Sequence, residues 1–234
     1  MNDCFFYNPP LDPYLDIIYE DNEIMVVNKP SGILSVKGRL PKHFDSVLLR
    51  IQNKYPDAQA VHRLDLDTSG LMVVALNKNS TSSLGKQFNN KTVEKNYVAK
   101  VLGKLTPKEQ IISAPLRCDW ENRPLQIIDP VMGKKSTTKV SLIHYDGKYS
   151  YVALLPVTGR SHQLRVHLKS IGHPILGDRF YGGTEAFQAY HRLCLHACYL
   201  SFYHPTTKEK MAFKSFPEFF DICKDIPLPY PFVI

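Results

Sequence analysis

The chain has 234 residues, 44% of them hydrophobic, and carries a formal net charge of +7. This composition predicts a globular protein with a sizeable core and excludes a disordered or fibrous chain. The longest apolar run, residues 71–76, is too short to span a bilayer, so we expect no membrane association. The positive charge favours a nucleic-acid partner, but it does not separate RNA from DNA or exclude a merely basic surface.

The N-terminal residues lack the charged and apolar regions of a secretory signal, so we expect a cytoplasmic protein. Five cysteines without a Cys-x-x-Cys pair predict reduced, buried thiols. They are Cys4, Cys118, Cys194, Cys198 and Cys223. The spacing Cys194-x-His196-x-Cys198 lies in a strand-like stretch and matches no common zinc pattern, so we expect no metal.

Hydrophobic periodicity predicts the secondary structure in chain order. A hairpin of residues 16–19 and 23–27 opens the chain, and a second hairpin turns across Asp146-Gly147. The remaining expected strands are 71–76, 93–102, 193–202 and 210–214. The expected helices are 46–55, capped by Asp45 or Ser46, then 80–89, 160–171, capped by Ser161, and 217–223. Residues 107–139 contain several Lys and Arg and are a candidate arm that clamps RNA.

Strands outnumber helices in this series, and hairpins join many of them. The alternation of strand and helix that marks a parallel α/β fold is not present. We therefore predict an α+β fold with a largely antiparallel mixed sheet and flanking helices and loops. No repeat and no Gly/Ser-rich linker divides the sequence, so we expect residues 1–234 to form one domain.

One stretch gathers reactive side chains between two apolar segments: His62-Arg63-Leu64-Asp65-Leu66-Asp67-Thr68-Ser69-Gly70. The simplest interpretation of its second half is a turn, in which residues 67–69 bond their own backbone and Gly70 adopts an unusual φ. That interpretation fits Arg63 and Asp65 less well, because they alternate across Leu64 and would point the same way. Loops between rigid strands often carry reactive groups, so this loop is a candidate site.

Asp65 and Asp67 also resemble the carboxylate pair of a glycosidase or a metal site. No third acidic residue lies nearby, and no calcium-binding loop pattern is present. The residues alone therefore leave either carboxylate as the reactive group.

A second candidate site is Gly159-Arg160-Ser161-His162-Gln163-Leu164-Arg165-Val166-His167. It places polar side chains and free backbone N–H groups at a helix N-terminus, which attracts phosphate or carboxylate. An ordinary capped amphipathic helix with solvated basic residues fits the pattern equally well. Tyr97, in the expected strand 93–102, is by pattern alone a core aromatic or a site residue. No phosphate-binding glycine loop occurs, so we expect no nucleotide cofactor.

Together these stretches resemble the RluA-type pseudouridine synthase family. Its hallmark, an HRLD-x-x-TSG loop, is matched at every hallmark position by residues 62–70. Other stretches similar to the family are Val27–Gly32, Lys95-x-Tyr97-x-Ala99, Gly159–His167, His173–Gly182 and the Cys118–Pro124 stretch. The resemblance covers about residues 15–215 and implies the pseudouridine synthase fold. The Asn28-Lys29-Pro30 stretch begins too early to leave room for the N-terminal S4-type domain of many relatives.

The resemblance assigns roles by position. It implies that Asp65 is the nucleophile. It leaves open whether Asp65 attacks C1′, attacks the base, or first assists loss of a ribose proton. It pairs Asp65 with Arg165, gives Tyr97 to the flipped uracil, and places Arg63 in the vacated base stack. Further expected substrate contacts are His62, Thr68, Arg160, His162 and Gln163. No metal or organic cofactor is implied, because the released base itself recombines through C5.

A chain without the S4-type domain resembles those members of the family that have dual specificity for 23S rRNA and a tRNA anticodon stem-loop. We therefore expect these RNAs as partners of a monomeric enzyme. Two other hypotheses are open. One is a catalytically silent RNA-binding or ribosome-assembly factor, for which an intact Asp65, Tyr97 and Arg165 would not be required. The other is hydrolysis of a glycosidic bond by Asp65 and Asp67.

Overall fold

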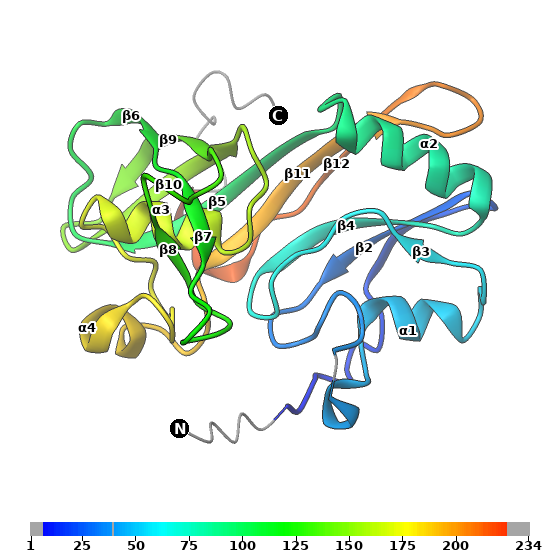
Figure 1. The fold of residues 1–234 in the computed structure, drawn as a ribbon, viewed down its shortest axis with the longest axis horizontal. Helices are drawn as coiled ribbons and strands as arrows, with labels where there is room; N and C mark the ends of the chain where they lie inside the picture. Colours follow the sequence, from blue (N-terminus) through cyan, green and yellow to red (C-terminus); the bar gives the residue numbers. More distant parts are fainter. Residues whose placement is uncertain (1–6, 39, 224–234) are drawn as a thin grey trace. The chain divides into compact units, whose positions relative to one another are not determined.

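A computed structural model describes residues 7–38 and 40–223, and the chain in it divides into two compact units (Figure 1). Of the described residues, unit 1 contains those up to Glu94 together with Tyr199–Ser215. Unit 2 contains Lys95–Cys198 and the described residues from Phe216 to Cys223. The chain therefore leaves unit 1 within strand β5 (Glu94–Leu102) and returns to it within strand β11 (Leu195–Tyr203).

Unit 1 is built around the hairpin of β1 (Ile17–Glu20) and β2 (Ile24–Lys29), which confirms the predicted first hairpin. β2 pairs antiparallel with β4 (Ser69–Ala75), and the strand order continues to β11, which pairs with β12 (Lys210–Lys214). The short β3 (Gln59–Ala60) also pairs with β4. All seven residues of β4 are buried, as a continuous apolar run predicts for a central strand.

Two helices accompany this sheet. Helix α1 (Val47–Gln52) begins at Ser46, whose Oγ accepts a hydrogen bond from the backbone N–H of Leu49 at 3.2 Å, one of the two caps predicted. A 3₁₀ turn, Pro41–His43, precedes it. Helix α2 (Lys78–Asn89) contributes Leu84 to a core formed with apolar side chains of β2, β4 and β11. This core includes Leu71, Val73, Leu200 and Phe202.

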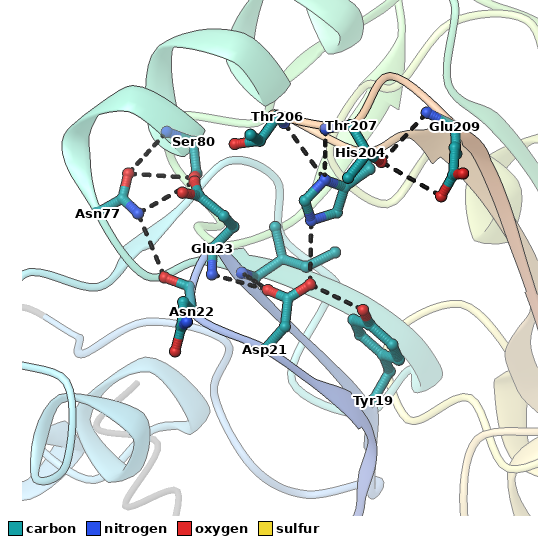
Figure 2. A network of polar contacts seen from close by, with 11 residues as sticks. Tyr19, Asp21, Asn22, Glu23, Asn77, Ser80, His204, Thr206, Thr207 and Glu209 are labelled. Carbon is teal, nitrogen blue, oxygen red and sulfur yellow. Dashed lines mark hydrogen bonds and ion pairs between the residues drawn. The ribbon is translucent and has the colours of Figure 1, made fainter.

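A polar network ties the β1–β2 turn to α2 and to the β11–β12 turn (Figure 2). Asp21 accepts hydrogen bonds from the backbone N–H groups of Glu23 and Ile24 at 2.7 and 2.8 Å, and from His204 Nε2 at 3.0 Å. Glu23 bonds to Asn77 at 3.1 Å and to Ser80 near the start of α2. These bonds hold the pKa values of both acidic side chains below their usual range, so the network keeps them charged at neutral pH.

In unit 2 the strand order of the sheet, following β11, is β5, β10 (Tyr149–Pro156), β9 (Thr137–Tyr145) and β6 (Glu109–Ser113). β10 pairs antiparallel with both β5 and β9, across the predicted Asp146-Gly147 turn. A separate antiparallel hairpin consists of β7 (Leu116–Cys118) and β8 (Gln126–Ile128). The predicted arm 107–139 thus contains β6, this hairpin and the start of β9.

The helices of unit 2 are α3 (Gln163–Ser170), α4 (Gly183–Gln188) and a 3₁₀ helix, Glu218–Cys223, where a terminal helix was predicted. Helix α4 was not predicted from the sequence. The prediction that Ser161 caps a helix from residue 160 was wrong, because α3 begins at Gln163 and its N-cap position is His162. The α+β class with a mainly antiparallel sheet is confirmed.

Three of the predicted buried thiols, Cys194, Cys198 and Cys223, are buried, and Cys118 is half-buried. Burial raises the pKa of the Cys194 and Cys198 thiols to about 12, so they stay protonated and unreactive. Cys4 lies outside the described residues. Across residues 7–38 and 40–223, no helix has the length and apolar character needed to cross a membrane.

Candidate active site

The loop of residues 62–68 in unit 1 is fastened by a buried ammonium group. Lys29 ends β2 and is 1% exposed. Its Nζ donates to the carbonyl oxygens of Pro30 at 2.9 Å, Ile33 at 2.8 Å and Leu66 at 2.9 Å. Three carbonyl dipoles therefore surround the charge, which compensates part of its loss of water. Lys29 fixes Leu66, the residue that follows Asp65.

The segment after Lys29 adds four hydrogen bonds to the backbone of the same loop. The hydroxyl of Ser31 donates to the carbonyl of Asp67 at 2.7 Å, and the N–H of Gly32 donates to that of Leu66 at 3.0 Å. Ser35 Oγ donates to the Leu64 carbonyl at 2.8 Å and accepts from the Leu64 N–H at 3.0 Å. These bonds, with the one from Lys29, hold the main chain on both sides of Asp65. We call residues 29–35 the clamp segment.

The side chains of the loop have different surroundings. Arg63 is exposed, whereas Asp65 and Asp67 are half-buried. Thr68 is only 2% exposed, and its N–H donates to the carbonyl of Asp65 at 3.2 Å. The φ of +115° at Gly70 confirms the unusual conformation predicted there, whereas the buried Thr68 hydroxyl has no hydrogen-bond partner and does not make the backbone bond expected of it.

His62 is held from two sides. Its Nε2 accepts a hydrogen bond from the N–H of Val73 at 3.1 Å, so this nitrogen carries no proton in that bond. Its ring stacks on Phe88 of α2, with centroids 4.7 Å apart. His62 therefore braces the start of the loop against β4 and α2. Its predicted RNA contact, and that of the buried Thr68, stays a prediction.

In unit 2, Arg165 forms a bidentate ion pair with Asp178. Arg165 Nε and Nη2 donate to the two carboxylate oxygens at 2.8 and 2.7 Å. The two residues are 2% and 1% exposed. Asp178 also accepts from the backbone N–H groups of Phe180 and Tyr181 at 2.9 and 3.1 Å. A carboxylate with four donors is well suited to hold a buried guanidinium in one orientation.

Two aromatic rings also lie close to Arg165. Its guanidinium carbon lies 5.2 Å from the ring centroid of Phe180 and 5.1 Å from that of Tyr181. The Tyr181 hydroxyl is 2.7 Å from His162 Nδ1 and accepts a hydrogen bond from the N–H of Gln126 at 2.9 Å. His162 itself adopts a left-handed conformation with φ of 53°. Tyr181 thus joins the N-cap of α3 to β8.

A chain of hydrogen bonds secures the rest of α3. The Gln163 amide donates to the Thr137 carbonyl and to Thr138 Oγ1, both at 3.0 Å. Its oxygen accepts from Thr158 Oγ1 at 2.7 Å and from the N–H of Arg160 at 3.1 Å. Since these bonds use both amide hydrogens and both oxygen lone pairs, Gln163 acts as a brace. Its predicted RNA contact stays a prediction.

The same series of hydrogen bonds continues from Thr138 to His167, which is fully buried. Its Nε2 lies 2.9 Å from the Ala114 carbonyl, and its Nδ1 lies 2.9 Å from Thr138 Oγ1. A carbonyl can only accept, so Nε2 carries the proton and Nδ1 accepts from the threonine hydroxyl. Burial lowers the pKa of His167 below its usual value, which keeps the ring neutral.

The remaining predicted residues of unit 2 are Tyr97 and Arg160. Tyr97 is half-buried on β5, opposite Leu154 of β10, and shares its face of the strand with Lys95. Burial lowers the pKa of Lys95. Arg160 is exposed, and its Nε donates to the Lys135 carbonyl at 3.4 Å.

Sequence reasoning missed the roles of Lys29 and Asp178. Both lie in stretches that resemble the family, but neither was assigned a function. A lysine at the end of a buried strand was the available signal for Lys29, because an uncompensated ammonium is unstable there. No comparable local signal pointed to Asp178, which lies 13 residues from its partner.

Comparison with known proteins identifies the class. Residues 23–170 match the family model described as RNA pseudouridylate synthase. The chain belongs to this family.

Among its relatives, the dual-specificity RNA pseudouridine synthase RluA of Escherichia coli K12 is 50% identical over 214 residues, which cover 91% of this chain and 98% of that protein. The protein with the same description from Vibrio parahaemolyticus is 54% identical over 204 residues, 85% of this chain and 82% of the relative. A solved structure, human RNA pseudouridylate synthase domain containing 1, matches with a TM-score of 0.73 and 31% identity, covering 95% of this chain and 90% of that one. The pseudouridine synthase fold expected from the sequence is thereby confirmed.

Proposed function

We propose that this protein isomerises specific uridines to pseudouridine in structured RNA, with 23S rRNA and a tRNA anticodon stem-loop as its substrates. The observation that carries the proposal is the clamped loop around Asp65. The clamp segment fixes the loop by its backbone, which orients the intervening side chains without using them. Such preorganisation is what a reactive carboxylate requires. The 50% identity to a protein described as a dual-specificity RNA pseudouridine synthase supports the same activity.

In this reaction the bond between C1′ and N1 of the uridine breaks, and a bond between C1′ and C5 forms. The hydrogen on C5 leaves as a proton and N1 gains one, so no oxidant or reductant is needed. We propose that Asp65 of unit 1 is the nucleophile and that Tyr97 and Arg165 of unit 2 act on the same uridine. Both units then form one catalytic domain.

Substrate contacts follow from exposure and charge. Arg63 and Arg160 are exposed and cationic, so we propose that they contact the RNA, with Arg63 occupying the base stack that the uridine leaves. We propose that His162 joins them at the start of α3. The enzyme acts as a monomer on cytoplasmic RNA, and this chemistry requires no cofactor, because the detached uracil is itself the group that rejoins the ribose.

Tritium release tests the proposal. Transcripts of 23S rRNA and tRNA that contain 5-tritiated uridine are incubated with the wild-type protein and with Asp65→Asn. We expect release by the wild type and none by the variant, which should still bind RNA with nearly unchanged affinity. The matched control is Asp67→Asn, which changes the neighbouring half-buried carboxylate in the same loop and should keep activity.

Other outcomes would identify the rival functions. A wild type that binds these transcripts but releases no tritium is an RNA-binding factor and not a synthase. Free uracil as the product, with severe loss in Asp67→Asn, would indicate hydrolysis by the two carboxylates.

A further inference from the structure

The tip of the β7–β8 hairpin presents a large aromatic side chain to solvent. Trp120 is 65% exposed, although tryptophan is normally mostly covered in a folded protein. The guanidinium carbon of Arg123 lies 4.1 Å from the centroid of its ring, which places the cation over one face. With one face covered by Arg123, so large an exposed fraction leaves the other face accessible.

The tip that carries Trp120 is ordered by its own hydrogen bonds. The Asn122 amide donates to Asp119 at 2.9 Å. The Asp119 N–H donates to the Leu125 carbonyl at 2.9 Å, and the Leu125 N–H donates to that of Asn122 at 3.0 Å. The tip is therefore a closed turn, which limits the entropy that Trp120 would lose on binding a ligand.

The base of the hairpin is fastened to the remainder of unit 2. Leu116 and Leu125 pack with Val166 of α3 and with Tyr181. The N–H of Gln126 donates to the Tyr181 hydroxyl, which also contacts His162. The position of Trp120 is thus coupled, through packed side chains, to the helix that carries Arg165.

Basic side chains lie on the segment that pairs with this hairpin. Leu116 exchanges two backbone hydrogen bonds with Lys134, at 2.8 and 3.0 Å, and the next residue, Lys135, accepts the bond from Arg160. Lys134, Lys135 and Arg160 are all exposed. An exposed aromatic ring, together with exposed cationic side chains on the segment that pairs with its hairpin, is a combination suited to unpaired nucleotides, because the ring can stack on a base while the cations contact phosphates.

We propose that Trp120 is a stacking platform for an unpaired base of the substrate RNA, outside the uridine that is modified. Arg123 supports the ring from one face, and the base stacks on the opposite face. Lys134 and Lys135 contact the phosphates of the same strand. This inference rests on the proposed RNA substrate, and it makes the hairpin tip the part of unit 2 that recognises a single-stranded loop.

The chain offers a direct probe, because Trp120 is its only tryptophan. The full-length protein is titrated with an RNA stem-loop of the anticodon-arm type and with a fully paired RNA duplex of equal length. We expect saturable quenching of the tryptophan fluorescence by the stem-loop and little change with the duplex. Abasic substitution along the loop should abolish the quenching at one position, which identifies the stacked base. Equal quenching by the duplex would overturn the proposal.

Kinetics on the same stem-loop supplies the second measurement. Base stacking on an aromatic side chain contributes about 1–3 kcal/mol, so Trp120→Ala should raise KM about 5- to 150-fold with kcat nearly unchanged. Trp120→Phe retains a stacking ring and should recover most of the loss. The matched control is Val131→Ala, which truncates an apolar side chain that is 87% exposed on the neighbouring turn and should change neither constant.

The result is separable from the proposed function. Turnover with unchanged KM in Trp120→Ala and no quenching would refute only the stacking platform. Loop-specific quenching without tritium release from the wild type would refute the synthase and leave the platform in place. Thermal melting of each variant reports whether a loss of binding follows from unfolding of the hairpin. If Trp120→Ala melts at a lower temperature than the wild type, the stable variant Trp120→Phe takes its place in the test. The affinities of Trp120→Phe and Val131→Ala for the stem-loop are then each compared with their affinities for the duplex. A wild-type preference for the stem-loop in Trp120→Phe supports stacking, and a loss of that preference refutes it.

Discussion

Asp178→Asn tests whether the buried ion pair with Arg165 holds unit 2 together. The substitution keeps the size of the side chain but removes the charge of Asp178, so the guanidinium, buried at 2% exposure, loses this charged bidentate partner. Removing one partner of a buried ion pair costs about 3–5 kcal/mol. The two hydrogen bonds from Arg165, at 2.8 and 2.7 Å, are both short and charge-assisted. We therefore expect the loss of unfolding free energy to fall within this range.

Urea unfolding followed by circular dichroism measures this cost. With a slope of about 2–3 kcal/mol per molar urea, the expected loss moves the midpoint down by about 1–2 M. The control is Glu94→Gln, which breaks the exposed pair with Lys210 and should cost less than about 1 kcal/mol. Because the buried pair also orients Arg165, we expect Asp178→Asn to lower kcat in the tritium assay, while the control keeps its activity.

A double-mutant cycle strengthens the test. Arg165→Met combined with Asp178→Asn removes both charges, so it should cost less than the sum of the two single variants. A loss below about 1 kcal/mol in Asp178→Asn, or additive losses in the double variant, would refute the view that the pair is a coupled buried unit.

Two further predictions concern the other braces of the site. Lys29→Met removes the ammonium from three carbonyls, so we expect a loss of about 2–4 kcal/mol, faster amide hydrogen exchange at residues 64–67 and reduced kcat; unchanged exchange there would contradict the clamp. His167 is kept neutral by burial, so its folded-state pKa lies below the value of 6.5 in the unfolded chain, and its contribution is complete above pH 6.5 and lost as the pH falls toward the folded-state pKa. The urea midpoint should therefore fall on acidification below pH 6.5 more steeply in the wild type than in His167→Gln, and parallel curves would count against a buried neutral imidazole.

Local signals in the sequence predicted the elements that depend on local interactions. The first hairpin and the Asp146-Gly147 hairpin follow from turn residues next to strand patterns, and Ser46 is a cap whose bond closes within three residues. Ser161 satisfied the same local rule, yet the helix starts later. The first turn of helix α3 is set by Gln163, whose side-chain amide donates hydrogen bonds to Thr137 and Thr138, about 25 residues away. Tertiary bonds of this kind override a local capping preference.

In the candidate site, too, local sequence signals predicted some features and missed others. The sequence led to the loop around Asp65, but its residues left Asp65 and Asp67 equivalent, and only the family resemblance favoured Asp65. Lys29 and Asp178 have partners separated from them in sequence, at Leu66 and Arg165. No periodicity or motif spacing encodes such pairs, because each forms only when separate segments meet in the fold. The burial and the hydrogen bonds of Lys29 and Asp178 in the folded protein show their roles.

The discontinuity of unit 1 affects the order in which the protein can mature during synthesis. The ribosome delivers β4 and the Asp65 loop early, whereas β11 and β12, which extend the same unit, are made after Lys95–Cys198 has emerged. Leu200 and Phe202 of β11 complete the core against Leu71 and Val73 of β4. A nascent chain that stops before β11 therefore carries the loop on an unfinished sheet with an exposed apolar edge. We therefore expect the loop to reach its active arrangement only after β11 has been made, and we expect the exposed apolar edge of a truncated chain to favour aggregation.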